Sequence, residues 1–197
     1  MKIFTVRHGQ TAWNLEGRMQ GSMDIPLDGT GLGQAERLSE RLSKEKIDII
    51  YTSDLARAVK TAEVINSRHN AEIVPSAAIR EINFGTFEGQ LLSESGAELD
   101  RLLNLGQAAP GGEDVYALGK RVHNFLDKIL SQNHENIVIV SHGVAIRAMI
   151  HYFLKLTLQE SNKLRVGNTA IHCFERGPDG NFSMTIENCT AHLPDFD

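Results

Sequence analysis

Cysteines, long apolar runs and clusters of basic residues are scarce in this sequence. Only two cysteines occur among 197 residues, and no apolar run approaches the length that would span a membrane. The 20 basic and 25 acidic residues are spread along the chain, which leaves no basic stretch for nucleic acid or an anionic membrane surface. The apolar run that follows Met1 ends at Arg7 and is too short for the core of a signal peptide. We therefore expect a cytoplasmic protein with no nucleic acid and no membrane among its partners.

The two cysteines, Cys173 and Cys189, lie in strand-like segments on either side of Pro178-Asp179-Gly180. In a hairpin centred on this turn, Cys173 would face roughly Met184 and Cys189 would face roughly Asn168, so the sulfur atoms would not meet. We expect two buried thiols in a reducing compartment rather than a disulfide.

The composition is that of an ordinary globular protein. Hydrophobic residues make up 41% and charged residues 23% of the chain, which is enough apolar material for one sizeable core. The length fits a single domain spanning residues 1–197. Because the formal net charge is −5, any affinity for anions must come from a local cluster of basic residues.

Four short segments rich in Ile or Val predict strands, at residues 3–6, 47–52, 72–74 and 137–140. The first and last are continuous apolar runs, as expected for strands that are covered on both faces. Between the strands, apolar residues recur every three or four positions, which predicts helices over about 32–42, 55–65 and 115–129. Asp54 and Asp114 are the expected N-caps of the second and third of these helices.

Strands that alternate with helices favour a three-layer α/β/α fold with a mainly parallel central sheet. A further helix is expected from about Val144, and residues 169–187 look like a hairpin. The segment 76–112 breaks the alternation, because it holds several glycines and a weak helical pattern around 94–103. We expect it to form an insertion, at about residues 77–112, over one end of the sheet.

Three polar clusters stand where predicted strands end. Arg7-His8-Gly9 follows the first strand, Arg57 comes shortly after the second, and Ser141-His142-Gly143 follows the fourth. The carboxyl ends of parallel strands meet at one edge of an open sheet, where ligands bind. The helices that start after Asp54 and Gly143 should add free backbone N–H groups there. Alone, each cluster has an ordinary structural interpretation, but their convergence predicts an anion site.

The order and content of these motifs resemble the histidine phosphatase superfamily, also called phosphoglycerate-mutase-like. The first motif continues as Arg7-His8-Gly9-Gln10-Thr11-Ala12-Trp13-Asn14, and the resemblance covers nearly the whole chain in the family's order. Further matching segments are Gln20-Gly21, Leu27-Asp28-Gly29-Thr30-Gly31, Ser53-Asp54-Leu55-Ala56-Arg57-Ala58, Arg80-Glu81-Ile82-Asn83-Phe84-Gly85, Pro110-Gly111-Gly112-Glu113 and Val140-Ser141-His142-Gly143 with Arg147. The resemblance implies a phosphoglycerate-mutase-like fold with a short insertion over the active site.

The resemblance also implies a phosphohistidine mechanism that needs no metal and no other cofactor. His8 would be the nucleophile, neutral, with its other ring nitrogen donating to a backbone carbonyl. Arg7 and Arg57 would each fork onto phosphate oxygens, and His142 would supply a further donor. Glu81 would protonate the leaving alkoxide and then deprotonate the water that hydrolyses the phosphohistidine.

Asn14, Gln20 and Gly21 match family positions that line the phosphate pocket or its mouth, and Gly143 opens the helix beside it. A loop residue that stabilises a turn would look the same, and for Gln20 both interpretations stay open. The other histidines match no family position with a role and are interpreted as structural or solvated: His69, His123, His134, His151, His172 and His192.

The family contains phosphatases, which pass the phosphoryl group to water, and mutases, which pass it to a second hydroxyl. Cofactor-dependent phosphoglycerate mutases carry a longer basic insertion with a Trp-Arg-Arg stretch. Residues 90–110 here contain one basic residue, Arg101, and no tryptophan. They look more like the insertions of broad-specificity phosphatases and α-ribazole phosphatase. We therefore expect a phosphatase acting on a small phosphate monoester, with a phosphoglycerate mutase as the alternative.

Two other classes of function are open at this point. A metallohydrolase could use His8, His142 and Glu81 as ligands. A non-catalytic module could bind a phosphorylated ligand on the same fold, although a binder has no need of a nucleophile and an acid together. The identity of the monoester and the oligomeric state also stay open, with a homodimer as one option.

Overall fold

The computed structural model describes residues 1–194, and its centre is a six-stranded sheet with the order β3-β2-β4-β1-β5-β6. The strands are β1 (Lys2–Arg7), β2 (Ile49–Thr52), β3 (Glu72–Pro75), β4 (Asn136–Ser141), β5 (Ile171–Arg176) and β6 (Phe182–Cys189). The first four pair in parallel, whereas β5 is antiparallel to both β1 and β6. The predicted α/β class with a mainly parallel sheet is confirmed, although β2 begins at Ile49 rather than at residue 47.

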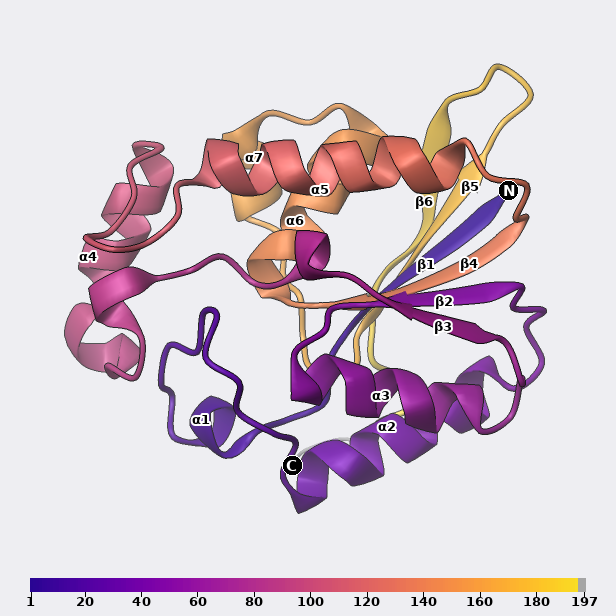
Figure 1. Cartoon of the computed structure of the whole chain (residues 1–197), viewed down its shortest axis with the longest axis horizontal. Helices are drawn as coiled ribbons and strands as arrows, with labels where there is room; N and C mark the ends of the chain where they lie inside the picture. Colours follow the sequence, from indigo (N-terminus) through magenta and orange to yellow (C-terminus); the bar gives the residue numbers. More distant parts are fainter. Residues whose placement is uncertain (195–197) are drawn as a thin grey trace.

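Helices cover both faces of this sheet. They are α1 (Ala12–Leu15), α2 (Gly29–Leu42), α3 (Ala56–Asn66), α4 (Leu92–Asn104), α5 (Val115–Leu130), α6 (Gly143–Leu154) and α7 (Leu158–Asn162), with short 3₁₀ turns η1 (Ala77–Ile79) and η2 (Gly85–Phe87). In Figure 1, α2 and α3 lie on one side of the sheet and α5 and α6 on the other. The same picture shows α1 and α4 at the end of the molecule that is remote from the N-terminus.

Two apolar layers pack the sheet between the helices. Ile3 and Ile137 face α5 and α6, whereas the next residues, Phe4 and Val138, face α2 and α3. All four side chains are buried, which explains why these strands are continuous apolar runs instead of alternating ones. Burying each such side chain stabilises the fold by roughly 1.5–3 kcal/mol.

One of the two expected helix caps is present. Asp114 accepts hydrogen bonds from Tyr116 N and Ala117 N at the start of α5, as predicted. The prediction for Asp54 is wrong, because α3 has Leu55 at its N-cap position without a side-chain cap. The Asp54 carboxylate instead makes a two-armed ion pair with Arg80, at 2.6 and 2.7 Å. The two parallel N–H···O contacts are the bidentate geometry that arginine and a carboxylate favour.

The predicted C-terminal hairpin forms, but its register differs from the expected one. Cys173 pairs with Ile186 and Cys189 with Ile171, because the ladder shifts around Cys173. Both thiols are free, as expected, although only Cys173 is fully buried. The expected insertion contains η1, η2 and α4, and its weak helical pattern corresponds to α4. Among residues 1–194, no helix is long and apolar enough to cross a membrane.

We expect the free energy of unfolding to fall as the pH is lowered from about 6.5 to about 4, because of His172. This fully buried side chain lies on β5 opposite Thr5, and burial lowers the pKa of His172 to about 4. The unfolded chain takes up a proton near pH 6.5, so between the two pKa values it binds the proton that the folded state excludes. This group should remove about 3 kcal/mol over that window.

Urea unfolding at a series of pH values measures this effect. His172→Leu should flatten the profile, and His134→Gln, which changes a histidine in the loop before β4, is the control. A residual slope is expected from His8 and His142, whose pKa values burial also lowers. An unchanged slope in His172→Leu would contradict the assignment.

Candidate active site

A cavity of about 300 Å³ brings together side chains from distant parts of the sequence. Of the nine residues expected at the site, all except His142 line this cavity, namely Arg7, His8, Asn14, Gln20, Gly21, Arg57, Glu81 and Gly143. They come from the end of β1, from α1 and the loop after it, from the first turn of α3, from the segment after η1 and from the start of α6. The sheet edge that the sequence predicted is therefore where these residues meet.

His8 is held in one tautomer by the backbone. Its Nδ1 lies 2.7 Å from the Gly9 carbonyl oxygen, which can only accept, so Nδ1 carries the proton and donates. Nε2 then keeps a free lone pair. Burial, followed by the charges of Arg57 and Arg7, lowers the pKa of His8 well below its usual value, so the ring is neutral at pH 7. This is the state that the resemblance predicted for a nucleophile.

Close backbone packing explains why a glycine follows His8. A Cβ on Gly9 would lie 2.4 Å from the Gly31 carbonyl oxygen, a distance that real atoms cannot adopt. The start of α2 therefore presses directly against the loop that carries His8. Gly9 N also donates to Thr61 Oγ1 on α3, which fixes the same loop from a second helix.

Arg57 is almost fully buried, and protein acceptors already hold all three of its nitrogens. Nε donates to His142 Nδ1 at 3.2 Å, Nη1 to the Met23 carbonyl at 2.6 Å and Nη2 to the Gly21 carbonyl at 2.9 Å. Burial lowers the pKa of Arg57 to about 10, which still leaves it charged at pH 7. One N–H remains on each terminal nitrogen, so the side chain can donate to a phosphate without leaving these partners.

His142 is not among the residues that line the cavity, but its ring lies next to that of His8. The ring is fully buried, and its centroid is 5.1 Å from that of His8. Because Arg57 donates to Nδ1, the proton of the neutral ring is on Nε2, which is buried and has no hydrogen-bond partner among residues 1–194. Burial and then Arg57 lower the pKa of His142 well below its usual value, so it is a neutral donor rather than a cation.

Arg7 is the second positive charge beside His8, and its side chain is half-buried. Its Nη1 donates to the Val166 carbonyl at 2.7 Å, while Nε is buried without a partner in the described part of the chain. Burial, with a contribution from Arg147, lowers the pKa of Arg7, whereas the Glu81 charge acts in the opposite direction. The positive charge beside His8 is therefore poorly compensated within the protein.

The Glu81 carboxylate lies at the start of α6, where we expected backbone N–H groups to be free for an anion. Its Oε1 accepts from Ile82 N, Val144 N and Ala145 N, each at 3.1 Å, and Val144 N is equally close to Oε2. At the start of α3, likewise, Ala56 N donates to the Asp24 carboxylate. The expectation of free N–H groups at these two helix ends is therefore wrong at these residues, because carboxylates of the chain satisfy the orphan donors.

A clamp from α5 holds the segment that carries Glu81, and the sequence did not predict it. Arg121 makes a two-armed ion pair with Glu113, both contacts at 2.8 Å. The same guanidinium donates to the backbone carbonyls of Ala78, Arg80 and Glu81. Glu113 is the last residue of the segment 110–113, which resembles the family but could not be assigned a role from the sequence. Nothing in the sequence singles out Arg121.

Other residues at or next to the cavity were also not predicted from the sequence. Asn168 Nδ2 donates to the carbonyl of His8 and to Asn14 Oδ1. Asn14 Oδ1 also accepts from Thr11 N, so its oxygen is committed to local structure. The outer wall is mainly apolar, and its residues are Phe84, Leu92, Leu99 and Leu103 together with Asp100 and Arg147. Gln20 is buried at the cavity and its Oε1 has no partner within residues 1–194.

The metal-centre alternative required three close ligands. Within residues 1–194, no group of three or more His, Cys, Asp or Glu side chains is placed to hold a metal ion. His8 and His142 instead each use one ring nitrogen in a hydrogen bond to the protein.

Comparison with known proteins shows which family the chain belongs to. The model of the histidine phosphatase superfamily (branch 1) matches residues 3–188. The chain belongs to this superfamily. A "Putative phosphoserine phosphatase 2" from Hydrogenobacter thermophilus is 32% identical over 176 residues, which are 86% of this chain and 87% of the relative.

One further relative and one solved structure align with nearly the whole length of this histidine phosphatase. A "Probable phosphoglycerate mutase GpmB" from Yersinia pestis is 31% identical over 204 residues, which cover 98% of this chain and 95% of the relative. The crystal structure of a mutant phosphoserine phosphatase from Entamoeba histolytica, in complex with phosphoserine, has a TM-score of 0.85 and 31% identity. It covers 98% of this chain and 99% of that chain. The family and the phosphatase relatives support a phosphatase.

We expect Arg121→Met to destabilise this histidine phosphatase by about 2–4 kcal/mol and to lower its turnover. The change leaves Glu113 unpaired and removes the donor of the Ala78, Arg80 and Glu81 carbonyls. Arg121→Lys should recover part of the stability but little of the turnover, because an ammonium cannot reach the separate acceptors that a fork reaches. Urea unfolding and steady-state kinetics measure the two effects.

Lys60→Met is the matched control, because it breaks an exposed ion pair with Glu63 on α3 and should change neither quantity measurably. Full turnover in a folded Arg121→Met protein would show that the clamp has no influence on the site.

Proposed function

We propose that the protein is a metal-independent phosphatase that hydrolyses small phosphate monoesters through a phosphohistidine on His8. The observation that carries this proposal is the state of His8, a neutral ring whose proton is fixed on Nδ1 by Gly9, near the buried Arg57 and the half-buried Arg7. A histidine in this state has a free Nε2 lone pair beside a positive field. That combination suits attack on a phosphate dianion.

The arginines and His142 would stabilise the transferred group. Arg7 and Arg57 neutralise charge on the equatorial oxygens in the transition state, which is the work that magnesium does in many other phosphoryl-transfer enzymes. His142 Nε2 carries a buried hydrogen without a partner in the described residues. Buried polar groups are nearly always paired, so a phosphate oxygen is the natural acceptor for this donor.

Glu81 would move the proton in both half-reactions. As His8 Nε2 bonds to phosphorus, the ester P–O bond breaks and Glu81 gives its proton to the departing alkoxide. In the second step Glu81 takes a proton from water, the oxygen attacks phosphorus, and the N–P bond breaks to release inorganic phosphate. Oε2 is the oxygen suited to this task, because the N–H donors of Ile82 and Ala145 are on Oε1.

The composition of the outer wall favours water over a second hydroxyl as acceptor. The α4 wall contributes Leu92, Leu99 and Leu103, and the single basic residue of α4, Arg101, is engaged with Glu98. A mutase must hold its phosphorylated intermediate and exclude water. The helix α4 offers no free cation for that purpose, and Arg147, the cation of the outer wall, belongs to α6. Phosphoglycerate mutase activity stays the alternative, because a relative named for it is 31% identical over almost the whole chain.

The size of the cavity limits the substrate. About 300 Å³ accommodates a phosphate and a few further heavy atoms, which fits a phosphorylated metabolite. Phosphoserine is a suitable first candidate, because two proteins with 31–32% identity carry that substrate in their names.

We expect His8→Ala to lower turnover at least about a thousandfold while the protein still unfolds cooperatively. The measurement is release of inorganic phosphate from a panel of monoesters, with 3-phosphoglycerate plus 2,3-bisphosphoglycerate added to detect mutase products. Quenching the wild type in alkaline detergent during turnover of labelled substrate should trap a base-stable, acid-labile phosphoprotein. His134→Ala is the control, and substantial activity in His8→Ala would remove the proposed nucleophile.

We expect Glu81→Gln to slow alkyl phosphates about a hundredfold more than p-nitrophenyl phosphate. A nitrophenolate leaves without a proton, whereas an alkoxide needs one. The ratio of the two rates is the informative quantity, because a general disturbance of the site lowers both. Equal losses would reassign the acid to another residue.

A further inference from the structure

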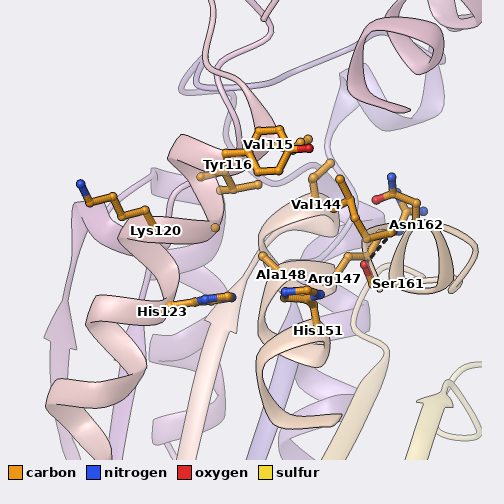
Figure 2. Close-up of a pocket in the computed structure, with 13 residues that line it drawn as sticks. Val115, Tyr116, Lys120, His123, Val144, Arg147, Ala148, His151, Ser161 and Asn162 are labelled. Atoms are coloured by element: carbon orange, nitrogen blue, oxygen red, sulfur yellow. Dashed lines mark hydrogen bonds between the residues drawn. The ribbon is translucent and has the colours of Figure 1, made fainter. Parts of the chain in front are cut away.

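A second cavity lies between α5, α6 and α7, and it is not the cavity that His8 lines. Its volume is about 250 Å³. Figure 2 shows its lining side chains, with Tyr116, Lys120 and His123 on α5 and Arg147 and His151 on α6. Neither the sequence motifs nor the proposed mechanism uses any residue of this cavity except those that it shares with the catalytic one.

The charges of this lining all have the same sign. Lys120 and Arg147 contribute cations, and no aspartate or glutamate is among the lining residues. The Arg147 Nε donates to the Leu164 carbonyl, which anchors the side chain while its terminal nitrogens have no partner in the described chain. The walls are otherwise mainly apolar. Such a lining selects an apolar body that carries a negative group.

The floor and mouth of the cavity present flat rings. The imidazoles of His123 and His151 stack with a centroid separation of 5.4 Å and an angle of 12°, and Figure 2 shows them extending toward each other from α5 and α6. His123 Nε2 and His151 Nδ1 are buried and have no partner within residues 1–194. Tyr116 is 68% exposed, which is unusual for an aromatic side chain. Flat surfaces of this kind favour an aromatic ligand.

The two cavities share the first turn of α6. Val144 and Arg147 line both of them. Val144 N is also one of the donors that hold the Glu81 carboxylate. A ligand packed against this turn would therefore contact the same residues that position Glu81 and that form a wall of the catalytic cavity.

We propose that the cavity between α5, α6 and α7 is a regulatory site for a small aromatic carboxylate. The carboxylate pairs with Arg147, Lys120 adds positive charge at the edge of the cavity, and the ring packs between Tyr116 and the histidine pair. Occupation changes the hydrolysis rate through Val144 and Arg147. The effect on rate rests on the proposed function, whereas the binding does not.

The first test measures binding alone. Indole-3-carboxylate and salicylate are titrated into the protein by calorimetry, with saturating inorganic phosphate present to occupy the catalytic cavity. We expect saturable binding at about millimolar concentration or tighter, and at least tenfold weaker binding of the corresponding neutral amides. Ring signals of His123 and His151, followed by NMR, should shift with the same affinity, whereas those of His8 should not.

Gly119 supplies a sharp variant, because it lines the cavity and a Cβ placed on it meets no atom within 4 Å. Gly119→Leu should fill the cavity without a clash and weaken binding at least tenfold. The matched control is Gly119→Ala, which shares the gain in helix propensity and should bind nearly as the wild type does. Lys120→Gln should weaken the carboxylates but not the amides.

The second test measures hydrolysis of p-nitrophenyl phosphate with and without indole-3-carboxylate. A change in rate that is present in the wild type and absent in Gly119→Leu is the expected result. Absence of saturable binding, or equal binding by Gly119→Leu, would overturn the site itself. Binding without a change in rate would overturn the regulatory role, and an inactive enzyme that still binds the probe would count against the proposed function alone.

Discussion

The site depends on one short hydrogen bond, from His8 Nδ1 to the carbonyl of Gly9. This bond fixes the single proton of the neutral ring on Nδ1, which leaves the Nε2 lone pair free. The surrounding burial and the two arginines oppose protonation of the ring, which leaves a neutral lone pair in a positive environment. Other contacts maintain this arrangement: Gly31 presses on the loop, Thr61 accepts from Gly9 N, and His142 and two carbonyls hold Arg57.

Carboxylates satisfy backbone N–H donors at two helix starts in this region. Glu81 closes the start of α6 and Asp24 the start of α3, so neither helix end offers these N–H donors to a ligand. In the proposed mechanism, binding of a phosphate therefore relies on side chains, namely Arg7, Arg57 and His142. Arg57 can do this because it is already desolvated and anchored, which reduces the entropy that a flexible surface arginine would lose on binding.

The sheet, its covering helices and the inner, polar part of the cavity lining could be predicted from the sequence, because strand ends fix where the Arg7-His8 and Ser141-His142 segments go. The errors came from competition between partners that are far apart in the chain. Asp54 pairs with Arg80 instead of capping α3, and Asp24 and Glu81 accept from the helix N–H groups that were expected to be free. The clamp formed by Arg121 could not be predicted from the sequence, since three of its acceptors are backbone carbonyls, which any residue provides.

The outer wall of the catalytic cavity is supplied largely by a single helix, α4, which lies between two turns with positive φ at Gly89 and Gly106. None of the groups that hold His8, Arg57 or the Glu81 backbone comes from this helix. Substitutions in α4 should therefore change the outer wall without removing a hydrogen bond that holds His8, Arg57 or the Glu81 backbone. That separation offers a physical reason why relatives of similar identity carry the names of different activities.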